Sequence, residues 1–301
     1  MAFSPIISPC LETPYVKRRC MLSYRHAFHA GNHADVLKHY VLSLVLDYFN
    51  QKPAPYWFVD THAGAGMYAL TSEFSQKNAE FETGIARLLE AKNLPKPLVS
   101  FVKTIKNFNQ NNQLDFCPGS PKIAEHFLRK DDKLRLFELH PSDFKILEQN
   151  FKGKSRQSKI AQQDGFAGIK ACLPPPTKRA VVLIDPPYEL KDDYNRVVDC
   201  LQDSLKRFAT GTYMLWYPLL QRPEPVIMTE KLKSLNPDNW LNISLNVQAP
   251  SMGGYGMHGS GMFIVNPPWT LPKTLEQAMP ALTQLLALDE AADYQLAWEI
   301  A

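Results

Sequence analysis

The sequence predicts an α/β fold built on a doubly wound, mostly parallel sheet. Short apolar runs alternate with amphipathic helical segments over roughly 200 residues, which is typical of strands and helices in such a sheet. Several of the runs end abruptly in an acidic residue or a glycine loop, as buried strands do when they lead into a functional loop. The chain has 301 residues, 45% of them hydrophobic, so it can bury the core of one large domain or two modest ones.

The N-terminal part of the fold is predicted as a helix, a strand and a glycine loop. Asn32 is a suitable N-cap, and apolar residues recur from there to Phe49 at helical spacing. The aromatic and β-branched run at residues 56–60 predicts the first strand. The sequence Thr61-His62-Ala63-Gly64-Ala65-Gly66 then predicts a loop whose glycines let a ligand approach the backbone.

Residues 70–117 are predicted as an inserted small helical subdomain, because helical patterns at 84–91 and 98–108 follow where a single crossover helix is expected. The main domain then comprises residues 21–69 and 118–301. Residues 1–20 show no apolar period and are expected to form an N-terminal extension, with Met21 as a candidate for the true start.

After residue 118 the alternation resumes. Ser120 at the N-cap and Pro121 in the first turn predict a helix, and two more helices are predicted at 142–151 and 194–208. With the first strand, the expected sheet has seven strands; the other six are predicted at 134–138, 160–163, 180–185, 212–216, 241–247 and 262–265.

Composition narrows the class of protein. A net charge of +3 allows a local contact with a polyanion but does not identify one. The five cysteines lack CxxC spacing, which argues against a disulfide framework and a zinc cluster. His26, His29 and His33 are closely spaced, but no acid-rich or cysteine set accompanies them, so we expect no metal site. With no run long enough to span a membrane, we expect a cytoplasmic protein without a membrane partner.

The most informative motif is Asp185-Pro186-Pro187-Tyr188, which directly follows the apolar run at 180–184. The two prolines stiffen the turn and hold its carbonyl groups in place. A carboxylate beside a rigid carbonyl can accept both hydrogens of a planar exocyclic amine, while the aromatic ring stacks on the base that carries it. This motif therefore indicates chemistry on the amino group of a nucleobase.

Other polar residues are expected at the ends of neighbouring strands. The glycine loop with Gly64 lacks the GxGxxG spacing of nicotinamide sites, but a nucleoside such as S-adenosylmethionine has no pyrophosphate to anchor and needs only a short loop. Glu138 is well placed to bind two ribose hydroxyls, and Asp164, followed by Gly165, to hold an adenine amino group. Either acid alone would be interpreted more simply as a solvated residue at the end of a strand. Because they follow successive strands of one sheet, a cofactor site is the favoured interpretation.

Three further features favour plainer interpretations. Asn266-Pro267-Pro268-Trp269 also follows an apolar run, but too little chain follows it for a central strand, so we interpret it as a structural stop. The glycine-rich stretch 252–261 is expected to be a hairpin tip rather than a phosphate cradle, because no helix follows it. The basic residues at 152–159 and 17–19 are either phosphate contacts or solvated side chains.

These strand-end motifs resemble those of the class I S-adenosylmethionine-dependent methyltransferases, whose fold is Rossmann-like. Over about residues 21–269 the sequence is similar to the bacterial 23S ribosomal RNA adenine-N6 methyltransferase J family. The segment 21–39 is the most specific part. The other matching segments are Asp60-Thr-His-Ala-Gly-Ala-Gly66, Pro118-Gly-Ser-Pro121, Glu138-Leu-His-Pro141, Ile184-Asp-Pro-Pro-Tyr188 and Phe208-Ala-Thr-Gly-Thr-Tyr213.

The resemblance implies roles for individual residues. Asp185 is the expected catalytic acid, acting with the Pro186 carbonyl and Tyr188, while Tyr24, Lys38 and Tyr188 are expected beside the target nucleotide. The residues expected to contact S-adenosyl-L-methionine are His39, His62, Gly64, Ser120, Glu138, Asp164, Gly165 and Asp185.

The sequence therefore predicts an enzyme that methylates N6 of a single adenine in 23S ribosomal RNA. The resemblance implies RNA that is free of ribosomal proteins, and we expect a monomer. One alternative is a DNA adenine-N6 methyltransferase, although only the insertion is available as a recognition domain. Another is a catalytically silent RNA-binding protein that keeps the fold, which the presence of Asp185 and Tyr188 argues against.

Overall fold

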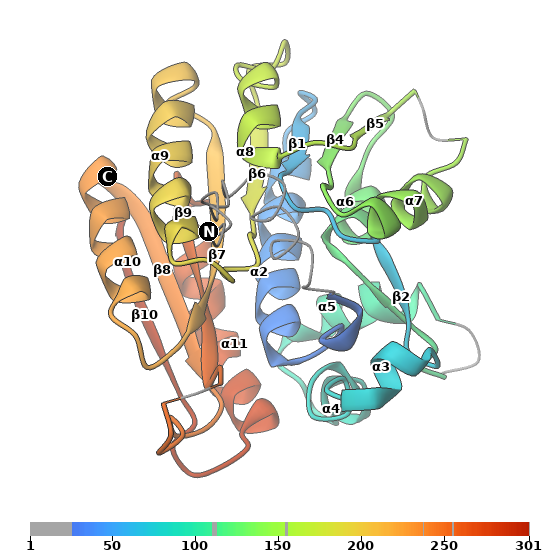
Figure 1. The fold of residues 1–301 in the computed structure, drawn as a ribbon, viewed down its shortest axis with the longest axis vertical. Helices are drawn as coiled ribbons and strands as arrows, with labels where there is room; N and C mark the ends of the chain where they lie inside the picture. Colours follow the sequence, from blue (N-terminus) through green and yellow to red (C-terminus); the bar gives the residue numbers. More distant parts are fainter. Residues whose placement is uncertain (1–25, 110–112, 154–155, 237, 255, 301) are drawn as a thin grey trace, which may run out of the picture.

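The computed structural model describes residues 26–109, 113–153, 156–236, 238–254 and 256–300. Its centre is a sheet in the strand order β10-β8-β9-β7-β6-β1-β4-β5 (Figure 1). The strands are β1 (Trp57–Asp60), β4 (Lys133–Phe137), β5 (Ser158–Ala161), β6 (Ala180–Ile184), β7 (Thr212–Leu219), β8 (Asn239–Asn246), β9 (Gly259–Val265) and β10 (Asp293–Ile300).

The sheet has eight strands, so the prediction of seven is corrected by one. All seven predicted strands are present, and β10 is added at the edge, antiparallel to β8. The pairs among β5, β4, β1, β6 and β7 are parallel, whereas β9 is antiparallel to both β7 and β8. Of these eight strands, only β9 and β10 therefore run against the others, and the sheet is mostly parallel as expected.

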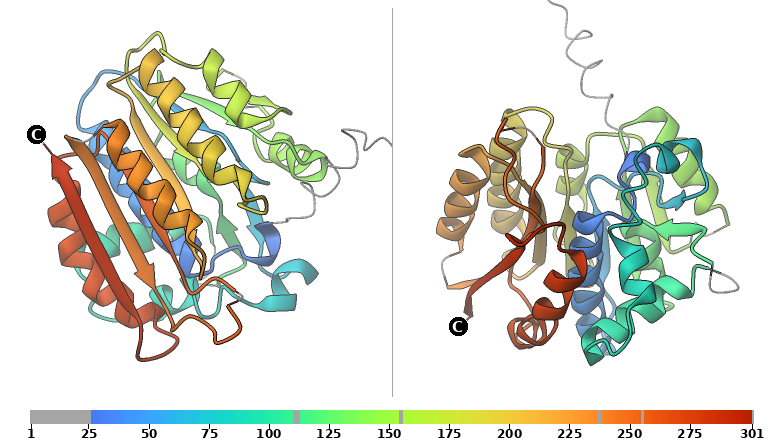
Figure 2. Two further views of the ribbon diagram at one scale, coloured as in Figure 1. Left: turned by 60° about the vertical axis from the view of Figure 1, so that its left-hand side comes forward. Right: turned by 90° about the horizontal axis from the view of Figure 1, so that it is seen from below.

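Helices cover both faces of the sheet, which makes it doubly wound (Figure 2). One face carries α2 (His33–Asn50), α6 (Ser120–Phe127), α7 (Pro141–Asn150) and α11 (Leu271–Leu286), and the other carries α8 (Gly165–Gly168), α9 (Asp192–Arg207) and α10 (Glu224–Leu235). Each face of the sheet has its own apolar core. Alternate residues of strand β6 enter them: Val181 and Leu183 pack into the core beneath α2, and Val182 and Ile184 into the core beneath α9. A strand buried on both faces has to be apolar throughout.

The predicted insertion contains the two helices expected there, α4 (Ile85–Glu90) and α5 (Lys96–Lys106). It also contains α3 (Glu73–Asn78), which was not predicted. A small antiparallel pair, also not predicted, joins its two ends: β2 (Met67–Ala69) directly precedes it, and β3 (Phe116–Pro118) closes it. Apolar side chains of α4 and α5, such as Leu88 and Phe101, join the core formed with α2 and α11. The division into a main domain and a subdomain stays a prediction.

The start of α6 differs from the prediction. Its N-cap is Gly119, without a side-chain cap, and Ser120 is the first helical residue. The Ser120 hydroxyl instead donates to Asp60 at the end of β1, at 2.6 Å. The side chain that was expected to cap a helix therefore joins the helix to the functional edge of the sheet.

The chain order reverses between β1 and β6, because β4 and β5 lie on one side of β1 and β6 lies on the other. Ligands of open α/β sheets bind beyond the carboxyl ends of the strands at such a reversal. Asp60 ends β1, and Asp185 directly follows β6, at this point. None of the described helices is both long and apolar enough to cross a membrane.

Candidate active site

A cavity of about 340 Å³ lies at the reversal point, and nearly every predicted site residue lines it. It is bounded by the carboxyl ends of the central strands and by the N-terminal turns of α2. Tyr24 lies outside the described residues. The predicted residues that line the cavity are Lys38, His39, His62, Gly64, Ser120, Glu138, Asp164, Gly165, Asp185, Pro186 and Tyr188.

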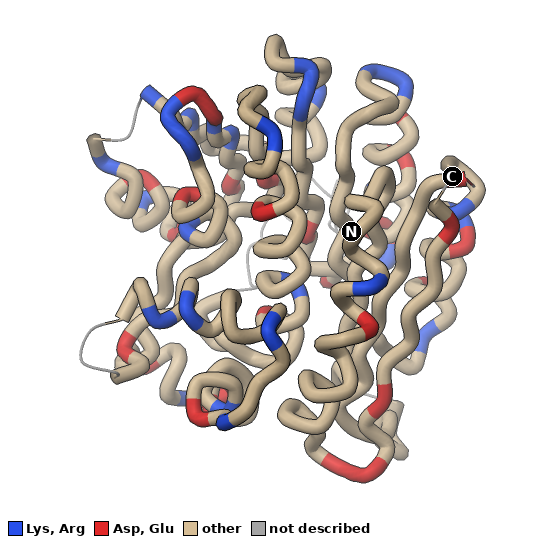
Figure 3. The backbone as a smooth tube through the Cα atoms, turned by 180° about the vertical axis from the view of Figure 1, so that it is seen from behind, with Lys and Arg blue, Asp and Glu red and all other residues tan. Residues whose placement is uncertain are grey.

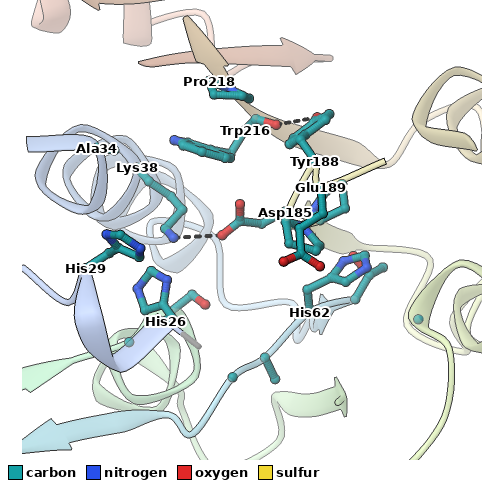
Figure 4. Close-up of a pocket in the computed structure, with 18 of the residues that line it drawn as sticks. His26, His29, Ala34, Lys38, His62, Asp185, Tyr188, Glu189, Trp216 and Pro218 are labelled. Carbon is teal, nitrogen blue, oxygen red and sulfur yellow. Dashed lines mark hydrogen bonds and ion pairs between the residues drawn. The ribbon is translucent and has the colours of Figure 1, made fainter. Parts of the chain in front are cut away.

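Asp185 is paired with Lys38 across the cavity (Figure 4). The Lys38 Nζ donates to Asp185 Oδ2 at 2.7 Å, although the two residues are 147 positions apart in the chain. The same ammonium group lies 2.9 Å from Oδ1 of Asp35. Lys38 is buried, and the two carboxylates raise its pKa against the lowering effect of burial. The ammonium is therefore charged, and two anions share it.

Tyr188 is held rigidly at the end of the Asp-Pro-Pro turn. Its φ of 51° lies in the left-handed region, which a non-glycine residue adopts only when its surroundings hold it there. Its hydroxyl donates to the Trp216 carbonyl at 2.6 Å, and its ring centroid is 4.6 Å from that of Tyr194. The residue is 5% exposed, so it offers only a small part of its ring to a base in the cavity.

Glu138 is fixed by two backbone donors. The amide of Gly64 donates to Oε2 at 2.8 Å, and the amide of His140 donates to Oε1 at 2.6 Å. Each oxygen keeps a second lone pair for a hydroxyl group. Burial raises the pKa of Glu138 to about 7 despite these hydrogen bonds. The hydrogen bond from Gly64 therefore fixes Glu138 to the glycine loop.

This pKa predicts that nucleoside affinity depends on pH. If Glu138 binds the ribose, its carboxylate accepts a hydrogen bond from each of two hydroxyls. Below pH 7 the side chain is protonated, and it is then a poorer acceptor for them. The affinity for S-adenosylhomocysteine should therefore fall as the pH is lowered from 8 to 6, by at most about tenfold per unit. Titration calorimetry at several pH values measures this, and Glu138→Gln should give a nearly flat profile. A wild-type profile as flat as that of the variant would contradict the role.

Asp60 organises the loop that follows β1. It is fully buried, its Oδ1 accepts from the His62 amide at 3.1 Å, and its Oδ2 accepts from Ser120 at 2.6 Å. Burial raises its pKa to about 6. His62 contacts the hydroxyl of Thr61 through Nδ1 at 2.8 Å, and burial lowers its pKa to about 4. His62 is therefore a neutral ring at physiological pH.

Asp164 already has two partners. Its Oδ1 caps α8 by accepting from the Phe166 amide at 2.9 Å, and its Oδ2 accepts from Arg196 of α9 at 2.6 Å. The guanidinium of Arg196 lies 4.4 Å from the ring centroid of Phe166. An adenine amino group would therefore share this carboxylate with Arg196.

The histidines at the start of the chain have carboxylate neighbours or are buried. His26 contacts Asp35 at 2.9 Å, and His29 contacts Glu80 at 2.9 Å. His39 is buried, and burial lowers its pKa to about 3, so its ring is neutral. Among the residues that the structure describes, no group of three or more His, Cys, Asp or Glu side chains is arranged to hold a metal ion.

Among the residues that hold or border the predicted site residues, four had no role assigned from the sequence: Asp35, Asp60, Arg196 and Trp216. Asp60 could have been found by the rule that selected Glu138, because it too ends a parallel strand. Trp216 lines the cavity from β7, next to β6. Asp35 and Arg196 lie on helices, and only the folded chain brings them to the strand ends.

The second Pro-Pro turn lies away from the cavity. Val265, which precedes it, pairs with Tyr213 at the start of β7, and Thr212 donates to the Asn266 carbonyl at 2.8 Å. Because β7 begins there, this turn lies at the edge opposite Asp185. Strand β9 ends at Val265 and the turn does not line the cavity, as expected of a structural stop. The glycine-rich stretch contributes Met257 to the cavity wall.

The Glu138 carboxylate and the closely packed glycine loops beside it suit a nucleoside cofactor. A Cβ on Gly64 would lie 2.2 Å from the Tyr68 hydroxyl, and one on Gly165 would lie 1.9 Å from the Thr61 carbonyl oxygen. The two loops therefore approach their neighbours more closely than any other residue type allows. Beside them, Glu138 offers carboxylate oxygens suited to a ribose diol.

Comparisons with known proteins agree with this geometry. A family model described as "Ribosomal RNA large subunit methyltransferase D, RlmJ" matches residues 53–300. Two relatives named ribosomal RNA large subunit methyltransferase J, from Escherichia coli (strain K12) and Haemophilus influenzae, are 44% and 43% identical to this chain. Each alignment covers 92% of this chain and 99% of the relative. A crystal structure from Legionella pneumophila is 31% identical with a TM-score of 0.83, covering 91% of this chain and 100% of that one.

Proposed function

The chain belongs to the family of ribosomal RNA large subunit methyltransferases described as RlmJ, and we propose that it methylates the N6 amine of a single adenine in 23S ribosomal RNA. The methyl donor is S-adenosyl-L-methionine. The observation that carries the proposal is the position of the Asp185-Pro186-Pro187-Tyr188 turn, which borders the same cavity as Gly64, Glu138 and Gly165.

We assign one group of the cavity's residues to the cofactor and another to the target amine. Glu138 binds the ribose hydroxyls, Gly64 and Gly165 admit the nucleoside close to the backbone, and Asp164 accepts from the adenine amino group. His39, His62 and Ser120 complete the cofactor site, with Ser120 acting through Asp60. Lys38 and Tyr188 border the target nucleotide.

The chain's own part in the reaction is to orient the amine and accept its proton. The lone pair of adenine N6 is delocalised into the ring, so the nitrogen becomes nucleophilic only when its two hydrogens are drawn out of the ring plane. Asp185 accepts one hydrogen and the Pro186 carbonyl the other. Bound S-adenosylmethionine supplies an electrophilic methyl group on a sulfonium. The new C–N bond would form as the S–CH3 bond breaks, leaving S-adenosylhomocysteine. N6 becomes acidic in this process and its proton passes to Asp185, which need not be a strong base beforehand.

The RNA partner fits the charge of the chain, whose net charge is +3. Lys and Arg residues occur on the loops before β4 and β5, with acidic residues beside them (Figure 3). Those loops lie at the edge opposite the cavity, so phosphate contacts by Lys152, Arg156 or Lys159 would be remote from the target base. We propose a monomer that acts in the cytoplasm on RNA free of ribosomal proteins.

The test is an incubation of the purified protein with labelled S-adenosylmethionine and 23S ribosomal RNA, followed by digestion and mass spectrometry. We expect N6-methyladenosine at a single position. Parallel reactions contain assembled large subunits or duplex DNA, and both should be poorer substrates. Label on another base, or a preference for duplex DNA, would refute the proposal, and analytical ultracentrifugation tests the monomer.

A further inference from the structure

Asp35 lies beneath the active site at the first turn of α2 and contacts several of its residues. Its Oδ2 accepts from the Gly31 amide and contacts His26 Nε2, both at 2.9 Å. Its Oδ1 lies 2.9 Å from Lys38 Nζ and 3.7 Å from His39 Nε2. The contact with Lys38 is a buried ion pair. The residue is 2% exposed and borders the cavity behind Lys38.

The position of Asp35 is fixed independently of Lys38. Asn32 caps α2 by accepting from the amides of Ala34 and Asp35, each at 3.0 Å. The Gly31 amide holds one carboxylate oxygen from the other side of the turn. Burial alone would raise the pKa of Asp35, but the charges around it, His26 and Lys38 foremost, hold it well below its usual range. Asp35 is therefore a fixed anion.

Lys38 competes with the target amine for Asp185. The ammonium group donates to Asp185 Oδ2 at 2.7 Å, and this carboxylate is the acceptor that the amine requires. Lys38 is buried, and a buried ammonium group cannot leave one anion without another in reach, because an unpaired buried charge is costly. Asp35 is that second anion, already 2.9 Å away.

We propose that Asp35 is a positioning residue that takes over the Lys38 ammonium when the target amine binds Asp185. The inference rests on the proposed function, because it assigns Asp185 to the amine. In this arrangement Lys38 keeps the Asp185 carboxylate oriented before the RNA binds. It then shifts toward Asp35 without crossing a region that lacks a counter-ion.

The kinetic test uses Asp35→Asn, Lys38→Met and the double variant. Asp35→Asn leaves Asp185 as the only anion beside Lys38, so kcat should fall at least about tenfold, with the KM for RNA changing less than about threefold. In the Lys38→Met background, the added Asp35→Asn should not lower kcat further, because the residue through which Asp35 acts is gone. If Asp35→Asn lowers kcat by the same factor in the wild-type protein and in Lys38→Met, Asp35 is merely structural and the proposal is wrong.

Asp132→Asn is the matched control. Asp132 is fully buried and paired with Arg129 at 2.9 Å, but it does not line the cavity. This variant should lose stability and keep its kcat, which separates loss of a buried ion pair from loss of positioning. Binding of S-adenosylhomocysteine to Asp35→Asn, measured by calorimetry, verifies that the variant is folded.

A second readout does not require turnover. The Lys38 Nζ lies 5.8 Å from the ring centroid of Trp216, so a shift of the ammonium changes the field at that ring. In protein labelled with 5-fluorotryptophan, Asp35→Asn should move the Trp216 fluorine resonance, assigned with Trp216→Phe, and leave that of Trp240 in place. An unmoved Trp216 resonance overturns the proposal. If the wild-type protein does not methylate RNA but the Trp216 resonance moves in Asp35→Asn, the proposed function is wrong. The sharing of the Lys38 ammonium group between Asp35 and Asp185 is then still supported.

Discussion

Asp185→Asn is expected to lower the rate of methyl transfer by about a hundredfold to a thousandfold, within the range that a positioned general base typically contributes. Asparagine keeps the shape of the side chain but lacks the negative charge that draws a hydrogen from N6 and accepts its proton. Its amide oxygen can still accept from Lys38 but carries no charge, so Lys38 retains only Asp35 as an anionic partner. Single-turnover rates with saturating RNA and cofactor measure this loss.

The expected effect on cofactor binding is much smaller. Glu138, Gly64 and Gly165 do not depend on Asp185 for their positions, since each is held by backbone contacts of its own. The affinity for S-adenosylhomocysteine should therefore change less than about tenfold, although Asp185 borders the cofactor. Asp203→Asn, which removes an exposed ion pair with Arg207, is the control for the same chemical change. Retained methylation in Asp185→Asn would remove Asp185 from the reaction.

The central strands could be predicted because burial on both faces leaves a continuous apolar run. All five residues of β6 are buried, and they stand out in the sequence for that reason. The edge strand β10 was missed although Tyr294 and Leu296 alternate with polar residues, a weaker pattern than a run. Helix α10 was missed because Val226 and Ile227 are exposed apolar side chains, which blur its amphipathic period.

The site could be predicted as far as it depends on strand ends. Parallel strands that end together bring Glu138, Asp164 and Asp185 to one edge of the sheet, so their order in the sequence indicates their proximity in space. For contacts made by helices, the sequence gives no comparable indication of which residues lie close together. The pairing of Lys38 with Asp185, and of Arg196 with Asp164, depends on how α2 and α9 pack on opposite faces of the sheet. Packing of that kind cannot be inferred from spacing.

The second large effect is expected at Gly165, where the start of α8 lies very close to the loop after β1. Gly165 begins α8, directly after Asp164, and lies against the backbone of the loop after β1. A Cβ at this position would lie 1.9 Å from the Thr61 carbonyl oxygen and 2.6 Å from its carbon. Thr61 cannot move away easily, because its amide and its hydroxyl both donate to the Leu183 carbonyl on β6, each at 3.1 Å.

Gly165→Ala is therefore expected to force α8 away from the β1 loop and to open the cofactor side of the cavity. Overpacking against a fixed backbone should lower the free energy of unfolding by about 3 kcal/mol, and we expect the affinity for S-adenosylhomocysteine to fall by about a hundredfold, as for a 1 Å misplacement of binding groups. Urea unfolding and titration calorimetry measure the two effects.

Gly153→Ala separates steric overlap from backbone strain in this experiment. Gly153 has a φ of 84°, and no atom lies within 4 Å of a Cβ built on it. Alanine there should cost about 1 kcal/mol of stability through its left-handed backbone alone, with no change in cofactor affinity. If Gly165→Ala bound S-adenosylhomocysteine as tightly as Gly153→Ala, the contact between α8 and the β1 loop would not shape the cofactor site. Glu138 would then have to position the nucleoside without it.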